Sequence, residues 1–210
     1  MSFYGPHDIK VLGCLFGSLL GDSYGEKRSG KSRIVLQQEN SNQEYLFWVH
    51  KLLSIRGYCS GIKPKSKLRI GKNNKVRFYR KIRTYSFSSF NWLIDCFYKD
   101  GIKQVPKKIY LEKYLTPLAL AIWISDDGGA CSRGVKIATN CFSEDDISLL
   151  CEVLKEQYGI VSKPNKSGFS KKTFKQQYCL YIHKQSLPIL QALVKPFMVN
   201  SMLKKIHITP

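Results

Sequence analysis

The sequence predicts an α+β fold made of two tandem halves of similar design, related by a pseudo-two-fold axis. Two short apolar motifs that each end in an acid, residues 15–23 and 120–128, lie about half a chain apart. Features that follow each motif recur at a similar offset, such as the sequences at 62–64 and 162–164. Segments with helical and strand periodicity alternate between these landmarks. The pattern indicates an internal duplication, not an array of many short repeats.

Each half contains, in order, a helix, two strands, a helix, two strands and a helix, which makes two αββαββα units. The halves are predicted to span residues 1–105 and 106–210. Helices are expected at residues 9–20, 43–56, 89–98, 118–125, 143–158 and 186–194. Strands are expected at residues 33–38, 67–70, 75–85, 136–140, 161–164 and 177–183. A turn at 71–74, a loop around Lys103 and Pro106, and a basic loop at 166–175 complete the prediction.

Three glycines form a stripe on the first motif helix. Gly13, Gly17 and Gly21 recur every four residues and therefore lie on one side of that helix. Glycine destabilises a helix interior by about 1 kcal/mol relative to alanine. Close approach of another backbone is the physical reason for such a stripe. We expect the two motif helices to pack side by side.

Each motif helix ends on a carboxylate, Asp22 in the first half and Asp127 in the second. An apolar helix rarely ends this way, because burying an unpaired charge is costly. Two neighbouring carboxylates also repel each other unless a cation lies between them. The duplicated motif therefore predicts a divalent metal site where the two helix ends meet.

The chain has 210 residues and a formal net charge of +19, from 34 basic and 15 acidic residues. This length allows one large domain or two small ones. The excess of positive charge favours a polyanionic partner, and nucleic acid is the first candidate. Membrane binding is disfavoured, because the charge is spread along the chain and no apolar run is long enough to span a bilayer.

Seven cysteines without a CxxC pair, together with four histidines, make a zinc site unexpected and fit a reducing compartment. Residues 1–10 resemble neither a signal peptide nor an arginine-rich transit peptide. A composition rich in lysine, asparagine, isoleucine, tyrosine and phenylalanine would suit an AT-rich organelle genome.

Basic and apolar residues alternate along the predicted strands. The sheets are therefore expected to place an apolar face on the helices and a basic, amide-bearing face toward solvent. Such a face fits the major groove of duplex DNA, where Arg, Lys, Gln and Asn contact base edges. The candidate DNA-binding residues are Arg33, Gln37, Lys67, Arg69, Lys75, Arg77, Lys81, Arg83, Lys136, Asn140, Gln177, Tyr181 and His183.

Together these features resemble the LAGLIDADG homing endonucleases in their single-chain, two-motif form. Residues 114–117 and 122–129 look especially similar to the second motif of monomeric, intron-encoded members from mitochondria. The resemblance covers nearly the whole chain. It implies antiparallel sheets that form a DNA-binding saddle around a central helix pair. It also implies a monomeric mitochondrial enzyme, encoded within a group I intron, that makes a double-strand break in a long DNA target.

By position, the resemblance makes Asp22 and Asp127 the catalytic metal ligands, with the carbonyl groups of Gly21 and Asp126 nearby. Lys103 and Lys204 correspond to the basic residues that flank the active site of the family. The second motif departs from the first, because Ile122 and Asp126 stand where the first has Gly17 and Gly21. The helix pair therefore cannot be closely symmetric. The Asp126 side chain is expected to be only a polar residue at a helix end.

Hydrolysis of a phosphodiester requires an activated water, charge neutralisation on the phosphate and a stabilised leaving oxygen. Bound Mg²⁺ can supply all three, and Mn²⁺ or Ca²⁺ can replace it in binding. Carboxylate and carbonyl oxygens are ligands that Mg²⁺ prefers. Lys103 and Lys204 would polarise water or steady the phosphate, and a simple phosphate contact is the alternative.

Two other functions fit the same scaffold. An RNA-splicing maturase, with group I intron RNA as its partner, needs the basic surface but not the acids. A DNA-binding regulator without catalysis likewise has no use for both acids. The presence of Asp22 and Asp127 favours the nuclease. An unrelated RNA-binding module would be expected to show aromatic residues for base stacking on a sheet face.

Overall fold

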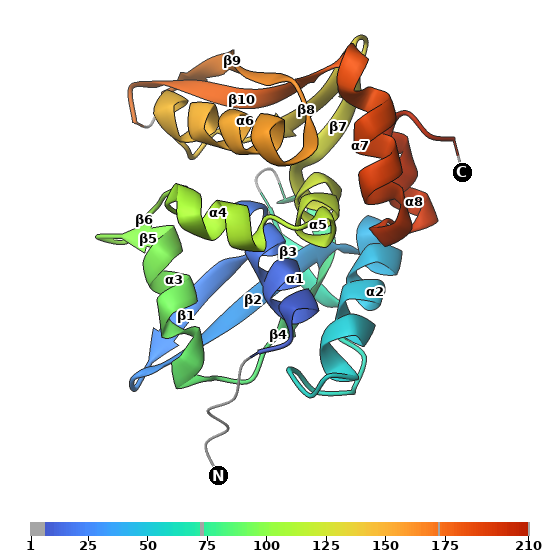
Figure 1. The fold of residues 1–210 in the computed structure, drawn as a ribbon. Coiled ribbons are helices and arrows are strands. Elements are labelled where there is room, and N and C mark those ends of the chain that lie inside the picture. Colours follow the sequence, from blue (N-terminus) through green and yellow to red (C-terminus); the bar gives the residue numbers. More distant parts are fainter. Residues whose placement is uncertain (1–6, 72–73, 172, 210) are drawn as a thin grey trace.

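The computed structural model describes residues 7–71, 74–171 and 173–209 (Figure 1). It shows the predicted α+β fold, with two αββαββα units in tandem. The first unit comprises α1 (Ile9–Leu20), β1 (Tyr24–Arg28), β2 (Lys31–Glu39), α2 (Gln43–Ser54), β3 (Lys67–Ile70), β4 (Val76–Arg83) and α3 (Asn91–Phe97). The second comprises α5 (Pro117–Asp127), β7 (Gly128–Cys131), β8 (Gly134–Ala138), α6 (Glu144–Tyr158), β9 (Ser162–Ser170), β10 (Lys175–His183) and α7 (Leu187–Val194).

Short elements join the units and end the chain. A small hairpin of β5 (Tyr98–Lys99) and β6 (Ile102–Lys103) follows α3, and α4 (Lys108–Tyr114) leads into α5. The chain continues after α7 through α8 (Asn200–Leu203) into a 3₁₀ turn at Lys204–Ile206. None of the helices within the described ranges is long and apolar enough to span a membrane.

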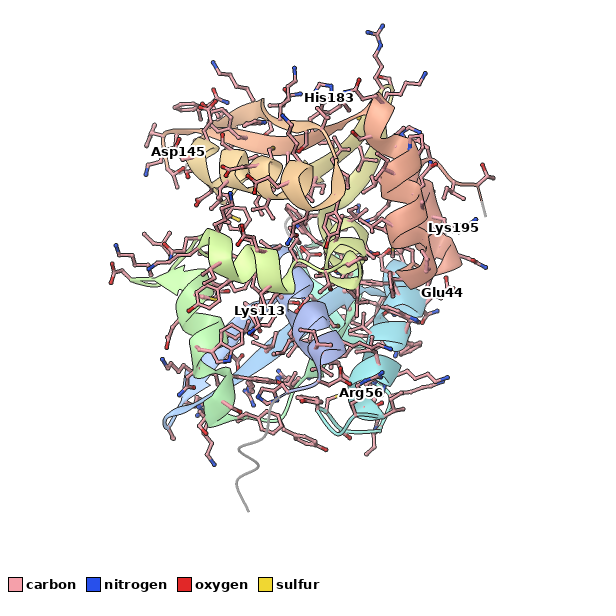
Figure 2. All side chains as sticks on the ribbon, in the orientation of Figure 1. Glu44, Arg56, Lys113, Asp145, His183 and Lys195 are labelled. Carbon is pink, nitrogen blue, oxygen red and sulfur yellow. The ribbon has the colours of Figure 1, made fainter. Side chains whose placement is uncertain are left out.

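Each unit builds one four-stranded antiparallel sheet, and the two sheets have equivalent strand orders. The order is β1-β2-β4-β3 in the first and β7-β8-β10-β9 in the second. Helices cover one face of each sheet, and strand β2 passes behind α1 in Figure 1. The covered face of the first sheet contributes Ile34, Leu36 and Ile82 to the core. Charged residues such as Asp145 and Lys195 lie on the outside (Figure 2).

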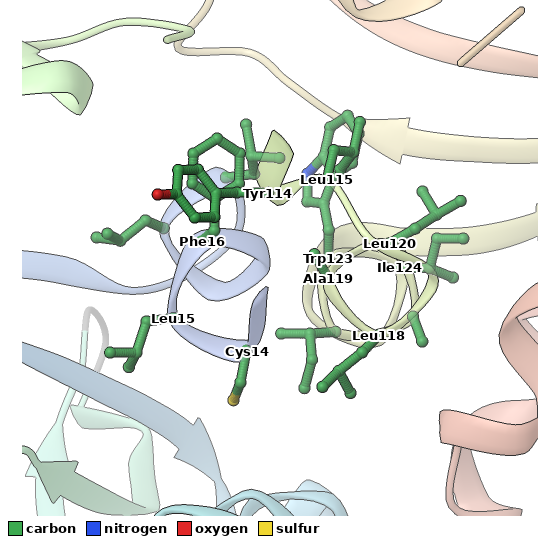
Figure 3. Packing of buried hydrophobic residues seen from close by; sticks show 14 of the residues in the cluster. Cys14, Leu15, Phe16, Tyr114, Leu115, Leu118, Ala119, Leu120, Trp123 and Ile124 are labelled. Atoms are coloured by element: carbon green, nitrogen blue, oxygen red, sulfur yellow. The ribbon is translucent and has the colours of Figure 1, made fainter. Parts of the chain in front are cut away.

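Helices α1 and α5 lie side by side at the centre of the molecule and are almost wholly buried (Figure 3). Local signals set where they begin. The Asp8 side chain accepts a hydrogen bond from the Lys10 amide at 2.7 Å, and Thr116 caps α5 by accepting from the Ala119 amide. Pro117 occupies the first turn of α5, where a missing amide hydrogen costs nothing.

The glycine stripe of α1 faces α5, as predicted. A Cβ atom at Gly17 would lie 2.1 Å from the carbonyl oxygen of Ala119, and one at Gly13 would lie 2.7 Å from Thr116 Oγ1. No side chain fits at the first of these positions, because the obstructing atom belongs to the backbone of α5. The glycines therefore fix the separation of the two helices, and with it the separation of their acidic ends.

The strand predictions were wrong in three places. β1 and β7 were missed, and the expected basic loop at 166–175 is mostly strand, because β9 and β10 form a long hairpin. Leu68 and Phe78 belong to the apolar strand face that was expected to pack against the helices, but they are 55% and 50% exposed. The β3–β4 hairpin extends beyond the helices that cover the sheet. The predicted turn at 71–74 includes residues 72 and 73, which lie outside the described residues, as do residues 1–6 of the N-terminal segment.

Candidate active site

The acidic ends of α1 and α5 meet beside the end of β2, an inner strand of the first sheet. Gln38, near the end of β2, joins them. Its Nε2 donates to Asp22 Oδ2 at 3.0 Å and to Asp126 Oδ1 at 2.9 Å. The Asp126 side chain packs against Gly21, where a Cβ would lie 2.7 Å from Asp126 Cβ. The structure therefore brings the acids of the two motifs together, although they are distant in the chain.

Burial and the charge of a neighbouring acid disfavour ionisation of Asp126 and Asp127. Burial raises the pKa of Asp127 to about 7, and the neighbouring charge of Asp22 adds to the rise. The pKa of Asp126 lies far above its usual range, again through burial first and the charge of Asp22 second. A cation between the carboxylates would relieve both effects.

Asp126 was expected to be only a polar residue at a helix end, but its side chain makes specific contacts within the site. Its carboxyl group accepts from Gln38, and the buried hydroxyl of Tyr45 lies close enough to lower its pKa slightly against the larger effect of burial. This side chain links β2, α2 and α5, which the motif sequence alone could not show. Gln38 was not among the predicted site residues, because it lies on the buried side of β2, whereas the prediction rested on the exposed side of that strand.

Two lysines bind the carbonyl groups at the helix ends. Lys103 Nζ donates to the carbonyl oxygen of Gly21 at 2.7 Å. Lys205 Nζ donates to those of Ser125 and Asp126 at 2.6 and 3.1 Å. The last carbonyls of a helix lack intrahelical donors, so a lysine amine is well placed there. Burial lowers the pKa of both amines, although the nearby acids oppose this.

The second lysine is Lys205 and not the predicted Lys204. Both belong to the 3₁₀ turn that follows α8, in which one residue turns the chain by about a third of a revolution. Lys204 points to the exterior and is exposed, whereas Lys205 points toward α5. The sequence gives no local signal for this choice, because it depends on how the 3₁₀ turn packs against the end of α5.

The donor set at the helix ends fits a hard divalent cation. Asp22 and Asp127 supply carboxylates, and Gly21 and Asp126 supply the carbonyl groups that now accept from lysine. No group of three or more His, Cys, Asp or Glu side chains is arranged to hold a metal within residues 7–71, 74–171 and 173–209. The remaining ligands of Mg²⁺ would therefore be waters or phosphate oxygens, as is usual for this ion.

A cleft of about 400 Å³ connects the acids with the open face of the first sheet. Acids, amides and basic side chains line it together. Its lining residues are Asp22, Tyr24, Gln37, Gln38, Glu39, Asn42, Arg69, Arg77, Tyr79 and Asp126. The cleft therefore places the candidate metal ligands beside the candidate DNA-binding residues.

Strand register gathers the predicted DNA-binding residues of the first half on one face. Paired residues point to the same side of a sheet, and the pairs include Gln37 with Lys81, Val35 with Arg83, Lys67 with Tyr79, and Arg69 with Arg77. Lys75 is exposed just before β4. Arg33 forms an ion pair with Glu26 at 2.5 Å, and Arg77 forms one with Glu39 at 2.7 Å.

The second sheet repeats this face with fewer charges. Tyr181 pairs with Lys136 on one side and with Lys163 on the other, and Lys163 was not among the predicted residues. Asn140 lies beyond the end of β8, where its carbonyl accepts from Gln177 Nε2 at 3.4 Å. His183 lies farther along β10, opposite Gly134. Figure 2 shows His183 on the outer side of the second sheet.

Comparison with solved structures shows a shared fold. The homing endonuclease I-WcaI, solved bound to its DNA recognition sequence, superposes with a TM-score of 0.84 at 18% identity. The similarity covers 99% of this chain and 89% of that one.

Comparison with curated sequences gives closer relatives. The chain is 42% identical to cytochrome b mRNA maturase bI2 of Saccharomyces cerevisiae over 96% of its length, and it spans about half (48%) of that protein. It is 39% identical to the bI2 maturase of Debaryomyces hansenii, covering 77% of it. The intron-encoded endonuclease ai4 of Dictyostelium discoideum is 32% identical over 76% of this chain and 99% of its own. Residues 12–190 match the family model of the LAGLIDADG DNA endonucleases, and the chain therefore belongs to the LAGLIDADG DNA endonuclease family.

Proposed function

We propose that the protein is a site-specific homing endonuclease that makes a metal-dependent double-strand break in a long duplex DNA target. The observation that carries this proposal is the meeting of Asp22 and the second motif's acids beside a basic sheet face. A regulator that only binds DNA would gain nothing from this costly group of carboxylates. Family membership and the intron-encoded endonuclease among the relatives support the same function.

The metal of this proposal is Mg²⁺, for which Mn²⁺ or Ca²⁺ can substitute in binding. Asp22 and Asp127 would hold it, with help from the carbonyl groups of Gly21 and Asp126. When bound, it would activate water and neutralise charge at the scissile phosphate. Its positive charge would also favour the ionised form of Asp127, against the burial and repulsion that raise the pKa of that carboxyl group.

The protein's own side chains would then orient the metal-binding carboxylates and neutralise charge on the phosphate. Gln38 fixes the Asp22 carboxylate through its Nε2 donor. The amines of Lys103 and Lys205 lie beside the acids and present positive charge where phosphate oxygens would enter. Burial lowers the pKa of both amines, which makes proton transfer to a leaving oxygen easier than for an exposed lysine.

The two open sheet faces would form the DNA-binding saddle. The basic residues of β2, β3 and β4 would contact one half of the target, and those of β8, β9 and β10 the other. In the free protein, Glu26 and Glu39 hold Arg33 and Arg77 in place on this face. A single chain supplies both halves, so a monomer is sufficient for the proposed activity.

A maturase is the second candidate function, because the two bI2 relatives are named for mRNA maturation. Under this proposal the partner is the RNA of the group I intron that encodes the chain. The same relatives support expression inside mitochondria. Nuclease and maturase activity are compatible in one chain, since the acids serve the first and are not needed for the second.

Cleavage of a randomised DNA library in the presence of Mg²⁺ tests the endonuclease directly and identifies the target. We expect a plasmid bearing the recovered site to be linearised by the wild-type protein. Asp22→Asn or Asp127→Asn should reduce the cleavage rate by at least about 100-fold, because each removes a ligand charge at the metal. DNA affinity measured with Ca²⁺ should change little. Unchanged cutting by either variant would overturn the assignment of the metal ligands.

A further inference from the structure

An aromatic cluster lies on the helical side of the molecule, away from the open sheet faces. It consists of Trp92 from α3 together with Tyr110 and Tyr114 from α4, and we call it the aromatic patch. The Trp92 ring lies 5.9 Å from Tyr110 with 24° between their planes, and 5.2 Å from Tyr114 with 34° between them. Helices α3 and α4 lie in front of the first sheet in Figure 1.

Trp92 separates two shallow surface hollows. One has a volume of about 630 Å³ and includes Tyr110 and the stem of Lys107 in its lining. The other has a volume of about 490 Å³ and includes Tyr114 and His7. Neither hollow shares a lining residue with the cleft at the acids. The patch, in which Trp92 and Tyr110 are half-buried and Tyr114 is buried, is therefore separate from the active site.

Positive charge surrounds the patch. Lys99 and Lys107 are exposed at the first hollow, and Lys113 is exposed at the second, with its Nζ 5.4 Å from the Tyr114 ring centre. These three lysines form no ion pair with any other described residue. The acid at the first hollow, Asp95, is already paired with Lys27 at 2.8 Å. The surface is thus complementary to an anion that carries flat apolar groups.

We propose that the aromatic patch binds an unpaired segment of RNA. Unstacked bases bind to aromatic side chains, and lysines around such rings hold the phosphates. The bases of duplex DNA are stacked on one another and cannot enter the hollows. An apolar protein segment would gain nothing from three unpaired lysines. This site goes beyond the proposed endonuclease activity, requires none of its acids, and leaves the saddle free for DNA.

Binding of a short fluorescein-labelled oligouridine RNA tests the proposal. The full chain is first saturated with unlabelled duplex DNA, without divalent ions, so that the saddle is occupied. We expect the RNA to bind this complex and Lys99→Gln/Lys107→Gln to weaken its affinity by about tenfold at low salt. Lys51→Gln/Lys195→Gln removes the same charge from exposed positions on α2 and after α7, and should change affinity by less than about twofold.

A second pair of variants separates stacking from charge. Trp92→Leu keeps an apolar side chain and should weaken RNA binding by about tenfold, whereas Trp92→Tyr keeps a ring and should restore most of it. Duplex binding checks that each variant is folded, and the lysine variants decide the question if Trp92→Leu is not. With 4-thiouridine in the RNA, crosslinks should map to α3 and α4. The proposal is overturned if no RNA binds the DNA-saturated protein, if both lysine variants behave alike, or if the crosslinks map to the sheets.

Discussion

The carboxyl group of Asp126 lies where its charged form is strongly disfavoured. Burial and the charge of Asp22 raise its pKa far above the value of an unfolded chain. For an acid whose folded pKa is raised, ionisation is more costly in the folded state than in the unfolded state. The stability of the metal-free protein should therefore fall as pH rises above the unfolded value and toward the folded one.

Asp126→Asn removes this penalty and keeps the Oδ1 acceptor that Gln38 uses. Without divalent ions, we expect the variant to exceed the wild type in free energy of unfolding by at least about 1 kcal/mol at pH 8, with the difference shrinking toward pH 4. Urea titrations at the two pH values measure this difference. The exposed Asp100→Asn is the control. A difference that does not depend on pH would contradict the environment described for Asp126.

Lys204 and Lys205 are adjacent in the chain, but we expect them to contribute differently to cleavage. Lys205→Met removes the amine that lies beside the acids and should lower the single-turnover cleavage rate by about 100-fold or more. Lys204→Met removes an exposed charge and should mainly reduce DNA affinity at low salt. Equal losses of cleavage rate in the two variants would contradict the assignment of this role to Lys205 and not Lys204.

Some residues of this site could be predicted from the sequence, and others could not. Asp22 and Asp127 follow from their place in a repeated motif, and Lys103 follows from the resemblance to the family. Gln38 and Lys205 do not, because their roles depend on how β2 and the last 3₁₀ turn approach the helix ends. Such contacts between distant segments leave no local mark on the sequence.

At the scale of elements, the packing of α1 against α5 sets the geometry of the centre. A Cβ at Gly17 would overlap the Ala119 carbonyl group, whereas one at Gly61 would meet open space. Gly17→Ala should therefore reduce the free energy of unfolding by about 3 kcal/mol or more, and Gly61→Ala should change it little. Chemical denaturation of both variants makes the comparison. Equal stability of the two variants would mean that the helices do not approach at Gly17.

Elements with strong local signals were predicted well, and those that depend on partners were not. Helix α6 starts with a capping box at Ser143 and Asp146 and ends at Gly159, whose φ is +67°. The serine and acids at its start and the glycine at its end are visible in the sequence. β1 has the polar sequence of a turn and becomes a strand only by pairing with β2. Likewise, α4 is short and its packing beneath α6 is not visible locally.

The whole molecule has approximate two-fold symmetry in its fold but not in its chemistry. The register of β7 with β8 repeats that of β1 with β2, which makes Thr139 the counterpart of Gln38. Thr139 Oγ1 donates to the Tyr178 carbonyl at 3.1 Å and does not reach an acid. Among the residues that the structure describes, Asp22 therefore has an amide partner and Asp127 has none, so the two halves of the centre differ in how they orient their carboxylates.

Electron paramagnetic resonance with Mn²⁺ tests the central claim most directly, because it reports the bound metal and not its consequences. The protein bound to duplex DNA is titrated with Mn²⁺, and the signal of DNA alone is subtracted. We predict that the wild-type complex binds additional Mn²⁺, that Mg²⁺ displaces it, and that Asp22→Asn/Asp127→Asn loses it while still binding DNA. Undiminished Mn²⁺ binding by that double variant would contradict a metal centre built by these two acids.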